Sequence, residues 1–153
     1  MKRARTSLLT ISICCLAFAR SVVAAPTEPP AKCPISLDRL DLRYNHAGGA
    51  SVPQLRLAFT SQTHRTITDM LLLLSILDFQ GNSHPYPDDL TYHREITPGM
   101  QPHSHIWNLD AASVDMHHAG ESVTLQKVQF ADGTIWKDDG SLVCTLSVDF
   151  HPK

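Results

Sequence analysis

The sequence predicts an all-β protein, an antiparallel β-sandwich of about seven strands. Short runs of alternating apolar and polar residues, the pattern of half-buried strands, recur through most of the 153 residues. Clusters of Gly, Pro, Asn and Asp separate these runs at the spacing that is typical of a sandwich. Cys33 and Cys144 stand near the two ends of the patterned region, and the first and last strands of many sandwiches lie close together.

Residues 1–25 precede this pattern and have the features of a secretory signal peptide. Three basic residues come first, followed by an apolar run over residues 7–19. This run is too short for a membrane span, which needs ~20 residues. We place the cleavage site within residues 22–25, where small residues stand at the required positions, and cleavage after Ala19 is the alternative.

The sequence disfavours two other roles for this N-terminal segment. A lipid-anchored cysteine is disfavoured because Ile13, and not a small residue, stands before Cys14 and Cys15. An uncleaved anchor is disfavoured because Arg20 interrupts the apolar run. We therefore predict an exported protein, secreted or periplasmic, with no membrane span after signal cleavage.

The charge of the exported chain excludes some classes of partner. Without residues 1–25, nine Lys and Arg face fifteen Asp and Glu, so the net charge is 9 − 15 = −6 with histidine neutral. Nucleic acids need clustered positive charge, so we expect no nucleic-acid partner. Anionic membrane surfaces are disfavoured for the same reason. A protein partner is compatible with this composition.

Cys33 and Cys144 are predicted to form a disulfide. Cys14 and Cys15 leave with the signal peptide, so the exported chain keeps an even pair in an oxidising compartment. The alternative is a catalytic thiol with a histidine partner. No recognisable cysteine-protease sequence surrounds either cysteine, which favours the disulfide.

The domain is predicted to occupy residues 33–153, after a proline-rich leader at residues 26–32. The first strand covers residues 35–44, with a change of phase near Asp38 and Arg39 that indicates a bulge. A turn follows at residues 45–49, and residues 52–61 alternate cleanly as a half-buried strand.

Residues 67–79 (ITDMLLLLSILDF) form the most apolar segment of the domain. A helix is the rival, because leucine is a good helix former. We predict a strand, because the run follows a β pattern, Gly81 and Asn82 end it as a turn, and only Thr66 stands before it as a cap. A strand that is covered on both faces is typically apolar throughout.

The middle of the domain alternates between loops and strands. Residues 83–89 contain two prolines and are predicted to be a loop. Residues 90–96 are predicted to be a short edge strand, and residues 101–109 a further strand. Residues 111–120 are predicted to be a loop or a helical turn.

The C-terminal part is predicted to contain two strands and a hairpin. Residues 123–130 read as a strand, and Asp132 and Gly133 predict a two-residue hairpin turn. A turn at residues 137–140 then leads into a strictly alternating last strand over residues 142–150.

The segment VTLQKVQFADGTIW resembles a signature of small secreted bacterial domains with an immunoglobulin-like sandwich, in which a strand ends in a Phe-x-Asp-Gly-Thr-x-Trp hairpin. The matching residues here are Phe130, Asp132, Gly133, Thr134 and Trp136. The segment LRLAFTSQTHRTITDMLLLLSILDFQGN is similar to the preceding strand pair of such domains, and ITPGM to their Pro-Gly turn. The likeness covers residues 37–146 and its motifs are short. It implies an immunoglobulin-like fold and a binding or structural module, without a named ligand.

A histidine pair on the predicted strand 101–109 is the candidate metal site. Residues two apart share a face of a strand, so His103, His105 and Trp107 point the same way. Two imidazoles on one face can reach the same copper or zinc ion. The competing interpretation is that Trp107 anchors the strand in the core and the histidines lie at the sheet edge. That interpretation is favoured, because such motif matches are mostly false positives.

Four neighbouring residues, Met100, Met116, His117 and His118, extend this candidate metal site, since exported copper proteins combine imidazole and thioether ligands. Their spacing does not match that of secreted copper chaperones.

The sequence contains no catalytic signature such as Gly-x-Ser-x-Gly or His-Glu-x-x-His. We therefore predict an exported binding or structural module that is not an enzyme and has no cofactor. A periplasmic copper or zinc binding protein that uses His103 and His105 is the alternative.

Overall fold

The computed structural model describes residues 32–46, 51–99, 101–114 and 117–149. The predicted signal peptide, residues 26–31 of the leader, Met100, Met116 and most of the 45–49 turn lie outside these described residues. The part of the chain that is described contains no helix with the length and apolarity needed to cross a lipid bilayer.

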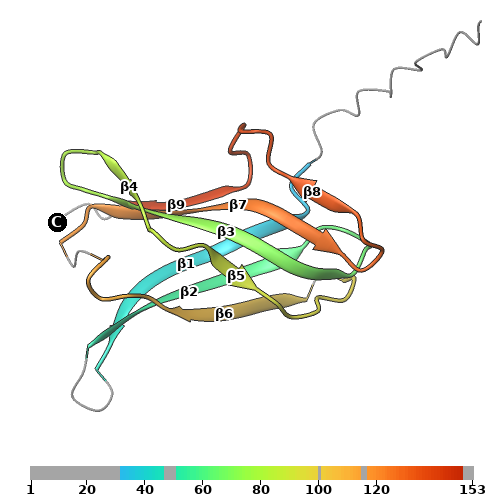
Figure 1. Ribbon diagram of the computed structural model, residues 1–153, viewed down its shortest axis with the longest axis horizontal. Helices are drawn as coiled ribbons and strands as arrows, with labels where there is room; N and C mark the ends of the chain where they lie inside the picture. The colour runs from blue at the N-terminus through green and yellow to red at the C-terminus, as the bar shows by residue number, and fades with distance from the viewer. Residues whose placement is uncertain (1–31, 47–50, 100, 115–116, 150–153) are drawn as a thin grey trace, which may run out of the picture.

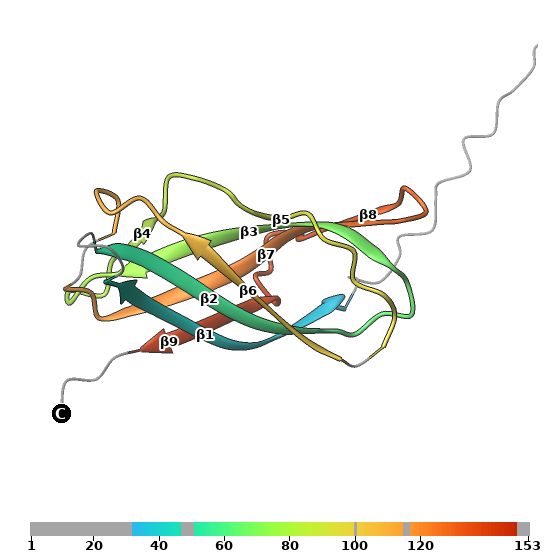
Figure 2. The same cartoon turned by 90° about the horizontal axis from the view of Figure 1, so that it is seen from below.

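Two antiparallel sheets face each other across the core, so the predicted all-β sandwich is confirmed (Figures 1 and 2). The first sheet, called sheet A, has the order β1-β2-β6. The second, sheet B, has the order β4-β3-β7-β8, with β5 also paired to β3 and β9 also paired to β7. The strands of sheet A are β1 (Ile35–Asn45), β2 (Val52–Ser61) and β6 (Pro102–Asn108). Those of sheet B are β3 (Ile67–Leu77), β4 (Ser83–Pro85), β5 (Leu90–Tyr92), β7 (Gly120–Phe130), β8 (Ile135–Lys137) and β9 (Thr145–Asp149).

Alternate residues of the long strands fill the core, as their sequence pattern predicts. β2 buries Leu55, Leu57 and Phe59 completely, and β7 contributes apolar residues from the facing sheet. The apolar segment 67–79 is a strand and not a helix, and β3 lies at the middle of sheet B between β7 on one side and β4 and β5 on the other. The predicted bulge in β1 is confirmed, because the register with β2 shifts between Leu37 and Arg39.

The prediction of a loop at residues 83–89 was wrong in part. β4 and β5 lie along the same edge of β3 as two short pieces of one edge strand, which raises the number of strands among the described residues to nine. Tyr86, between them, is buried, and its amide donates a hydrogen bond to the carbonyl oxygen of Leu74. Pro85 and Pro87 lack the N–H that a continuous ladder needs, so the edge strand is interrupted and not abolished.

The hairpin between β7 and β8 has a three-residue loop and not the predicted two-residue turn. The Gly133 amide donates to the Phe130 carbonyl and the Phe130 amide donates to the Thr134 carbonyl. Gly133 has φ +83°, the left-handed conformation that closes a type I turn with a glycine bulge. Sequence alone located the hairpin correctly, because glycine is the residue that tolerates this conformation.

The last strand is shorter than its alternating sequence predicts. β9 begins at Thr145, whereas Leu142 is exposed and has a left-handed φ of 56°. The preceding turn is held by side chains, because Asp138 accepts a hydrogen bond from the Gly140 amide and Asp139 accepts one from the Ser141 amide. These local bonds direct the backbone away from the ladder until Cys144.

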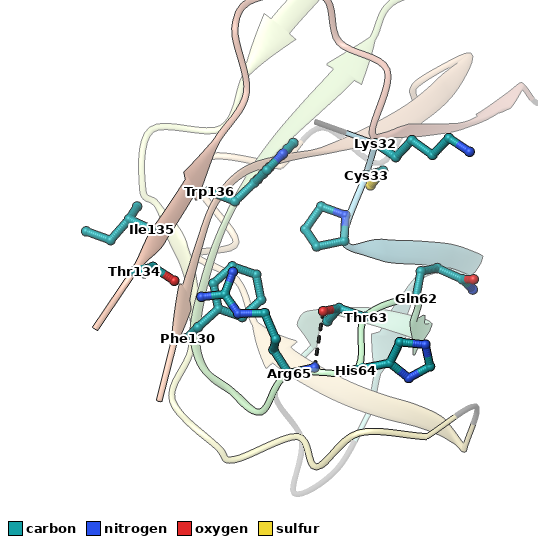
Figure 3. A pocket seen from close by; sticks show the side chains of 11 residues that line it. Lys32, Cys33, Gln62, Thr63, His64, Arg65, Phe130, Thr134, Ile135 and Trp136 are labelled. Carbon is teal, nitrogen blue, oxygen red and sulfur yellow. Dashed lines mark hydrogen bonds between the residues drawn. The ribbon is translucent and has the colours of Figure 1, made fainter. Parts of the chain in front are cut away.

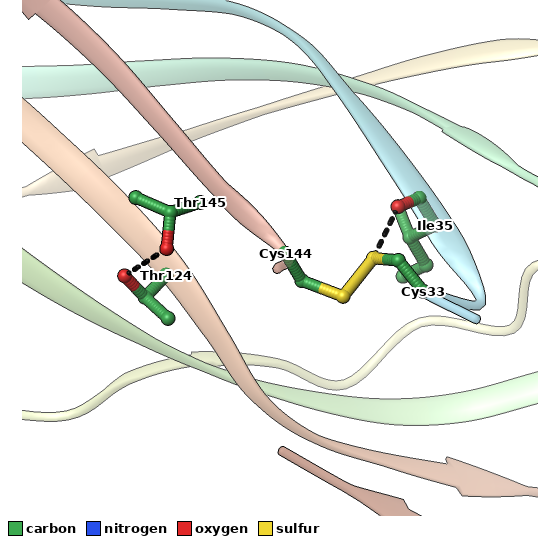
Figure 4. Close-up of a disulfide and its surroundings, with 5 residues drawn as sticks. All are labelled: Cys33, Ile35, Thr124, Cys144 and Thr145. Atoms are coloured by element: carbon green, nitrogen blue, oxygen red, sulfur yellow. Dashed lines mark hydrogen bonds between the residues drawn. A yellow bond between two sulfur atoms is a disulfide. The ribbon is translucent and has the colours of Figure 1, made fainter. Parts of the chain in front are cut away.

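The predicted disulfide is present between Cys33, just before β1, and Cys144, just before β9 (Figure 4). The two Cα atoms are 5.5 Å apart, within the range that a disulfide needs. The bond therefore joins the two sheets at one end of the sandwich, where the first and last strands meet.

Candidate functional site

The predicted histidine pair lies on β6 among aromatic rings. His103, His105 and Trp107 are half-buried, while the residues between them are exposed, so the predicted sharing of one face is confirmed. The His103 ring stacks on Phe59 with centroids 5.8 Å apart. The His105 ring meets Trp107 edge to face at 4.5 Å, and it meets the Tyr92 ring of β5 in the same way at 5.1 Å. These rings close the side of the sandwich between β6 and β5.

Both imidazoles are packed against aromatic rings. Burial, aided by the nearby charge of Arg94, lowers the pKa of His105. The Nε2 atom of His103 is buried and has no hydrogen-bond partner. Among the described residues, no group of three or more His, Cys, Asp and Glu side chains is arranged to hold a metal ion. Copper or zinc binding by His103 and His105 stays a prediction.

His117 and His118 contribute to a different place in the structure. With Asp78 and His84 they line a cavity of about 380 Å³ at the β3–β4 turn. His118 Nε2 is 3.2 Å from Oε2 of Glu121, which is fully buried on β7. Burial raises the pKa of Glu121, so this carboxyl group is held in the interior at an electrostatic cost.

A larger cleft, of about 780 Å³, opens at the end of the sandwich that carries the disulfide (Figure 3). Three segments that are distant in sequence form its walls. These are residues 32–34 before β1, residues 62–65 between β2 and β3, and the β7–β8 hairpin with Phe130 and residues 134–136.

A network of charged groups fixes the hairpin wall of the cleft. The Arg65 guanidinium lies 3.7 Å from the centroid of the Phe130 ring, and its Nη2 is 2.7 Å from both carboxylate oxygens of Asp132. The hydroxyl and amide of Thr134 also donate to Asp132. Together with Arg65, these bonds from Thr134 lower the pKa of Asp132 to about 2. The β2–β3 turn and the β7–β8 hairpin are thus held together across the bottom of the cleft.

The opposite wall is the segment that the disulfide holds. Cys33 lines the cleft and is linked to Cys144 (Figure 4). The Gln62 amide donates a hydrogen bond to the Pro34 carbonyl, at 2.9 Å. The position of Lys32 at the rim therefore depends on one covalent bond and one backbone hydrogen bond.

The cleft combines positive charge with apolar surface. Lys32, His64 and Arg65 line it, and none of the described residues that line it is an Asp or Glu. Phe130 and the half-buried Trp136 supply the apolar surface, whereas the side chain of Ile135 points away from the cleft (Figure 3). The whole chain carries a net charge of −2, so basic groups gather here against the overall balance. Such a cleft suits a ligand with both an anionic and an apolar part.

Sequence reasoning missed this cleft. The Phe-x-Asp-Gly-Thr-x-Trp hairpin was noted for the fold alone, and Lys32 was assigned to the leader. Arg65 lies between two predicted strands and gives no signal in the sequence, because its partner Asp132 is 67 positions away.

Comparison with known proteins adds no further assignment. No protein-family model matches the chain, and no curated protein matches it.

Proposed function

We propose that this chain is an exported, non-catalytic binding module that takes an acidic, partly apolar segment of a partner protein into the cleft between Lys32 and Trp136. The observation that carries the proposal is the composition of the cleft, where three basic side chains meet the apolar surface of Phe130 and Trp136, and the adjacent carboxylate of Asp132 is already paired with Arg65. Its volume suits a few side chains of an extended segment and is within the ~300–1,000 Å³ range of ligand sites.

Each part of the cleft has a role in this proposal. Lys32 lies at the exposed rim, where a cation attracts an acidic segment and governs the rate of association. Trp136 offers apolar surface to a side chain of the partner, and aromatic residues are common binding anchors. Arg65 is already paired with Asp132, so its main role is to hold the walls in place.

Export is the second part of the proposal. The disulfide is compatible with an oxidising compartment outside the cytoplasm, as the apolar N-terminal segment also indicates. The immunoglobulin-like resemblance of the hairpin is in line with a binding role, because such sandwiches present loops and edges to partners.

Selection from a random peptide library displayed on phage, with the oxidised protein immobilised, tests the cleft. We expect the selected peptides to combine Asp or Glu with a large apolar residue. Their affinity should fall by about 30-fold in Trp136→Ala, the effect of losing a hot-spot contact. Lys32→Glu should slow association, whereas Arg56→Glu, at an exposed cation of β2 outside the cleft, should not.

Peptides that are basic, or that bind Trp136→Ala and Lys32→Glu as well as the wild type, would contradict the proposal. Far-ultraviolet circular dichroism and the urea midpoint of each variant separate a local loss of binding from a loss of fold, and Lys32 is exposed, so its substitution should leave both unchanged.

A further inference from the structure

β3 carries leucines on both of its faces, although only one face lies against the core. Its inward residues, from Met70 to Ile76 at every second position, are buried in the sandwich. Leu71, Leu73 and Leu77 alternate with them on the outer face of sheet B and remain partly exposed. An apolar residue at nearly every position is typical of a strand that is covered on both sides.

No described strand is available to cover this outer face. All nine strands belong to one of the two sheets, so the described chain has no third layer over sheet B (Figures 1 and 2). The neighbours of the leucines are small hydroxyl residues. Leu73 pairs with Thr124, and the Thr124 hydroxyl is 2.8 Å from that of Thr145 on β9. These two hydroxyls bond to each other, and their neighbours Ser75 and Ser122 are also uncharged, so the middle of the face carries no charge.

The net charges at the two ends of this face have opposite signs. At one end Lys127 pairs with Leu71, and Lys137 lies beside it on β8. Asp69 is also at this end and is paired with His93, so the two lysines leave the end net positive. At the other end, Leu77 is followed by Asp78 and pairs with Gly120, which in turn pairs with Asp149. A two-fold axis perpendicular to the face would bring the basic end of one copy over the acidic end of another. The face is therefore complementary to itself, as a symmetrical interface requires.

The size of the face is also suitable for a dimer. The eleven residues of β3 extend over roughly 35 Å at the rise of a strand. The sheet is four strands wide at this level, which is about 19 Å at the usual strand spacing. The product is roughly 700 Å² for each copy, near the ~800 Å² per partner of a standard protein interface. Two sheets can pack in this way about 10 Å apart, as they do within a sandwich.

We propose that two copies of this chain associate face to face through the outer surface of sheet B, with Leu71, Leu73 and Leu77 at the centre of the contact. This interface is separate from the cleft, which it neither needs nor replaces. The apolar run of β3 is then buried on both sides, by the core of its own chain and by the second copy.

Sedimentation velocity of the purified, oxidised protein over a range of concentrations tests the dimer. We expect the wild type to be dimeric at micromolar concentration, and Leu73→Glu to raise the dissociation constant by 100-fold or more, because it places a carboxylate in a dry contact. Ile106→Glu is the matched control. Ile106 is an exposed apolar residue on the outer face of sheet A, so the same substitution there should leave the dimer intact.

Leu73→Thr is the milder second variant, since threonine suits strands and preserves the fold. We expect it to weaken the dimer by about tenfold. A wild type that is monomeric at 100 µM, or a dimer that survives Leu73→Glu while the urea midpoint is unchanged, overturns the proposal. The cleft variant Lys32→Glu lies outside sheet B and should weaken peptide binding without weakening the dimer, so failure of one proposal is distinguishable from failure of the other.

Discussion

Replacing both Cys33 and Cys144 by alanine removes the covalent link between the beginning of the domain and its last strand. The two cysteines are 111 positions apart, so the link closes a loop that includes nearly the whole domain. The chain-entropy relation gives about 4.7 kcal/mol of stabilisation for a loop of roughly this size, through the restricted unfolded chain. This is a large share of the ~5–15 kcal/mol by which ordinary domains are stable.

The native contacts around the bond should largely survive the substitution. Cys144 is buried, but its carbonyl still accepts a hydrogen bond from the Leu125 amide, at 2.9 Å. Cys33 is followed at once by Pro34, whose carbonyl is bonded to the Gln62 amide. The main effect is therefore expected on the unfolded state and not on the folded sandwich.

Urea denaturation followed by tryptophan fluorescence measures this effect. The double variant should lose about 4–5 kcal/mol of unfolding free energy, and its m-value should rise because the unfolded chain is no longer cross-linked. Treatment with a reducing agent should bring the wild type to the same value and leave the variant unchanged. Mass spectrometry establishes that the wild type is oxidised. If the unfolding free energy of the double variant is then within ~1 kcal/mol of that of the wild type, the entropic reasoning is refuted.

Three further predictions concern Gly120, Glu121 and the histidine pair of β6. Gly120→Ala should lower the unfolding free energy, measured by urea denaturation, by about 1–3 kcal/mol. The reason is that the added Cβ would lie 2.5 Å from the backbone oxygen of Val148. An unchanged urea midpoint would show that β9 can move away from the added methyl group. Burial raises the pKa of Glu121, so folding favours the protonated carboxyl group. The stability that this group contributes is present at low pH and is lost as the pH rises through the folded-state pKa. The gain in melting temperature of Glu121→Gln over the wild type should therefore be larger at pH 8 than at pH 4.5, and a gain that shrinks with pH would contradict this assignment. Calorimetric titration of tag-free protein with Zn²⁺ or Cu²⁺ should show no stoichiometric metal uptake by His103 and His105, since both rings are packed against other rings. Metal uptake that is lost in His103→Ala/His105→Ala would favour the metal carrier instead.

Much of the fold could be predicted because the relevant signals are local. A strand needs only alternation over a few residues, and β2 shows it at every position from Val52 to Ser61. The bulge near Asp38 was visible as a break in the same alternation. Gly133 located the hairpin, although the length of its loop depended on backbone hydrogen bonds that the residue type does not specify.

The errors occurred where non-local pairing competes with local signals. The prolines on either side of Tyr86 predicted a loop, yet burial of the Tyr86 ring and pairing with β3 keep this edge in the sheet. The alternation after Leu142 predicted a longer last strand, yet aspartate side chains turn the backbone away from the ladder.

By itself, the sequence determined most of the strands, the disulfide pair and the shared face of His103 and His105. Each of these depends on spacing along the chain or on an even count of cysteines. Only the tertiary structure decided that Lys32 and Trp136 line one cleft, and that no described strand covers the outer leucines of β3. The physical reason is that periodicity specifies which side of a strand is apolar, whereas the pairing and stacking of distant strands decide what each side meets.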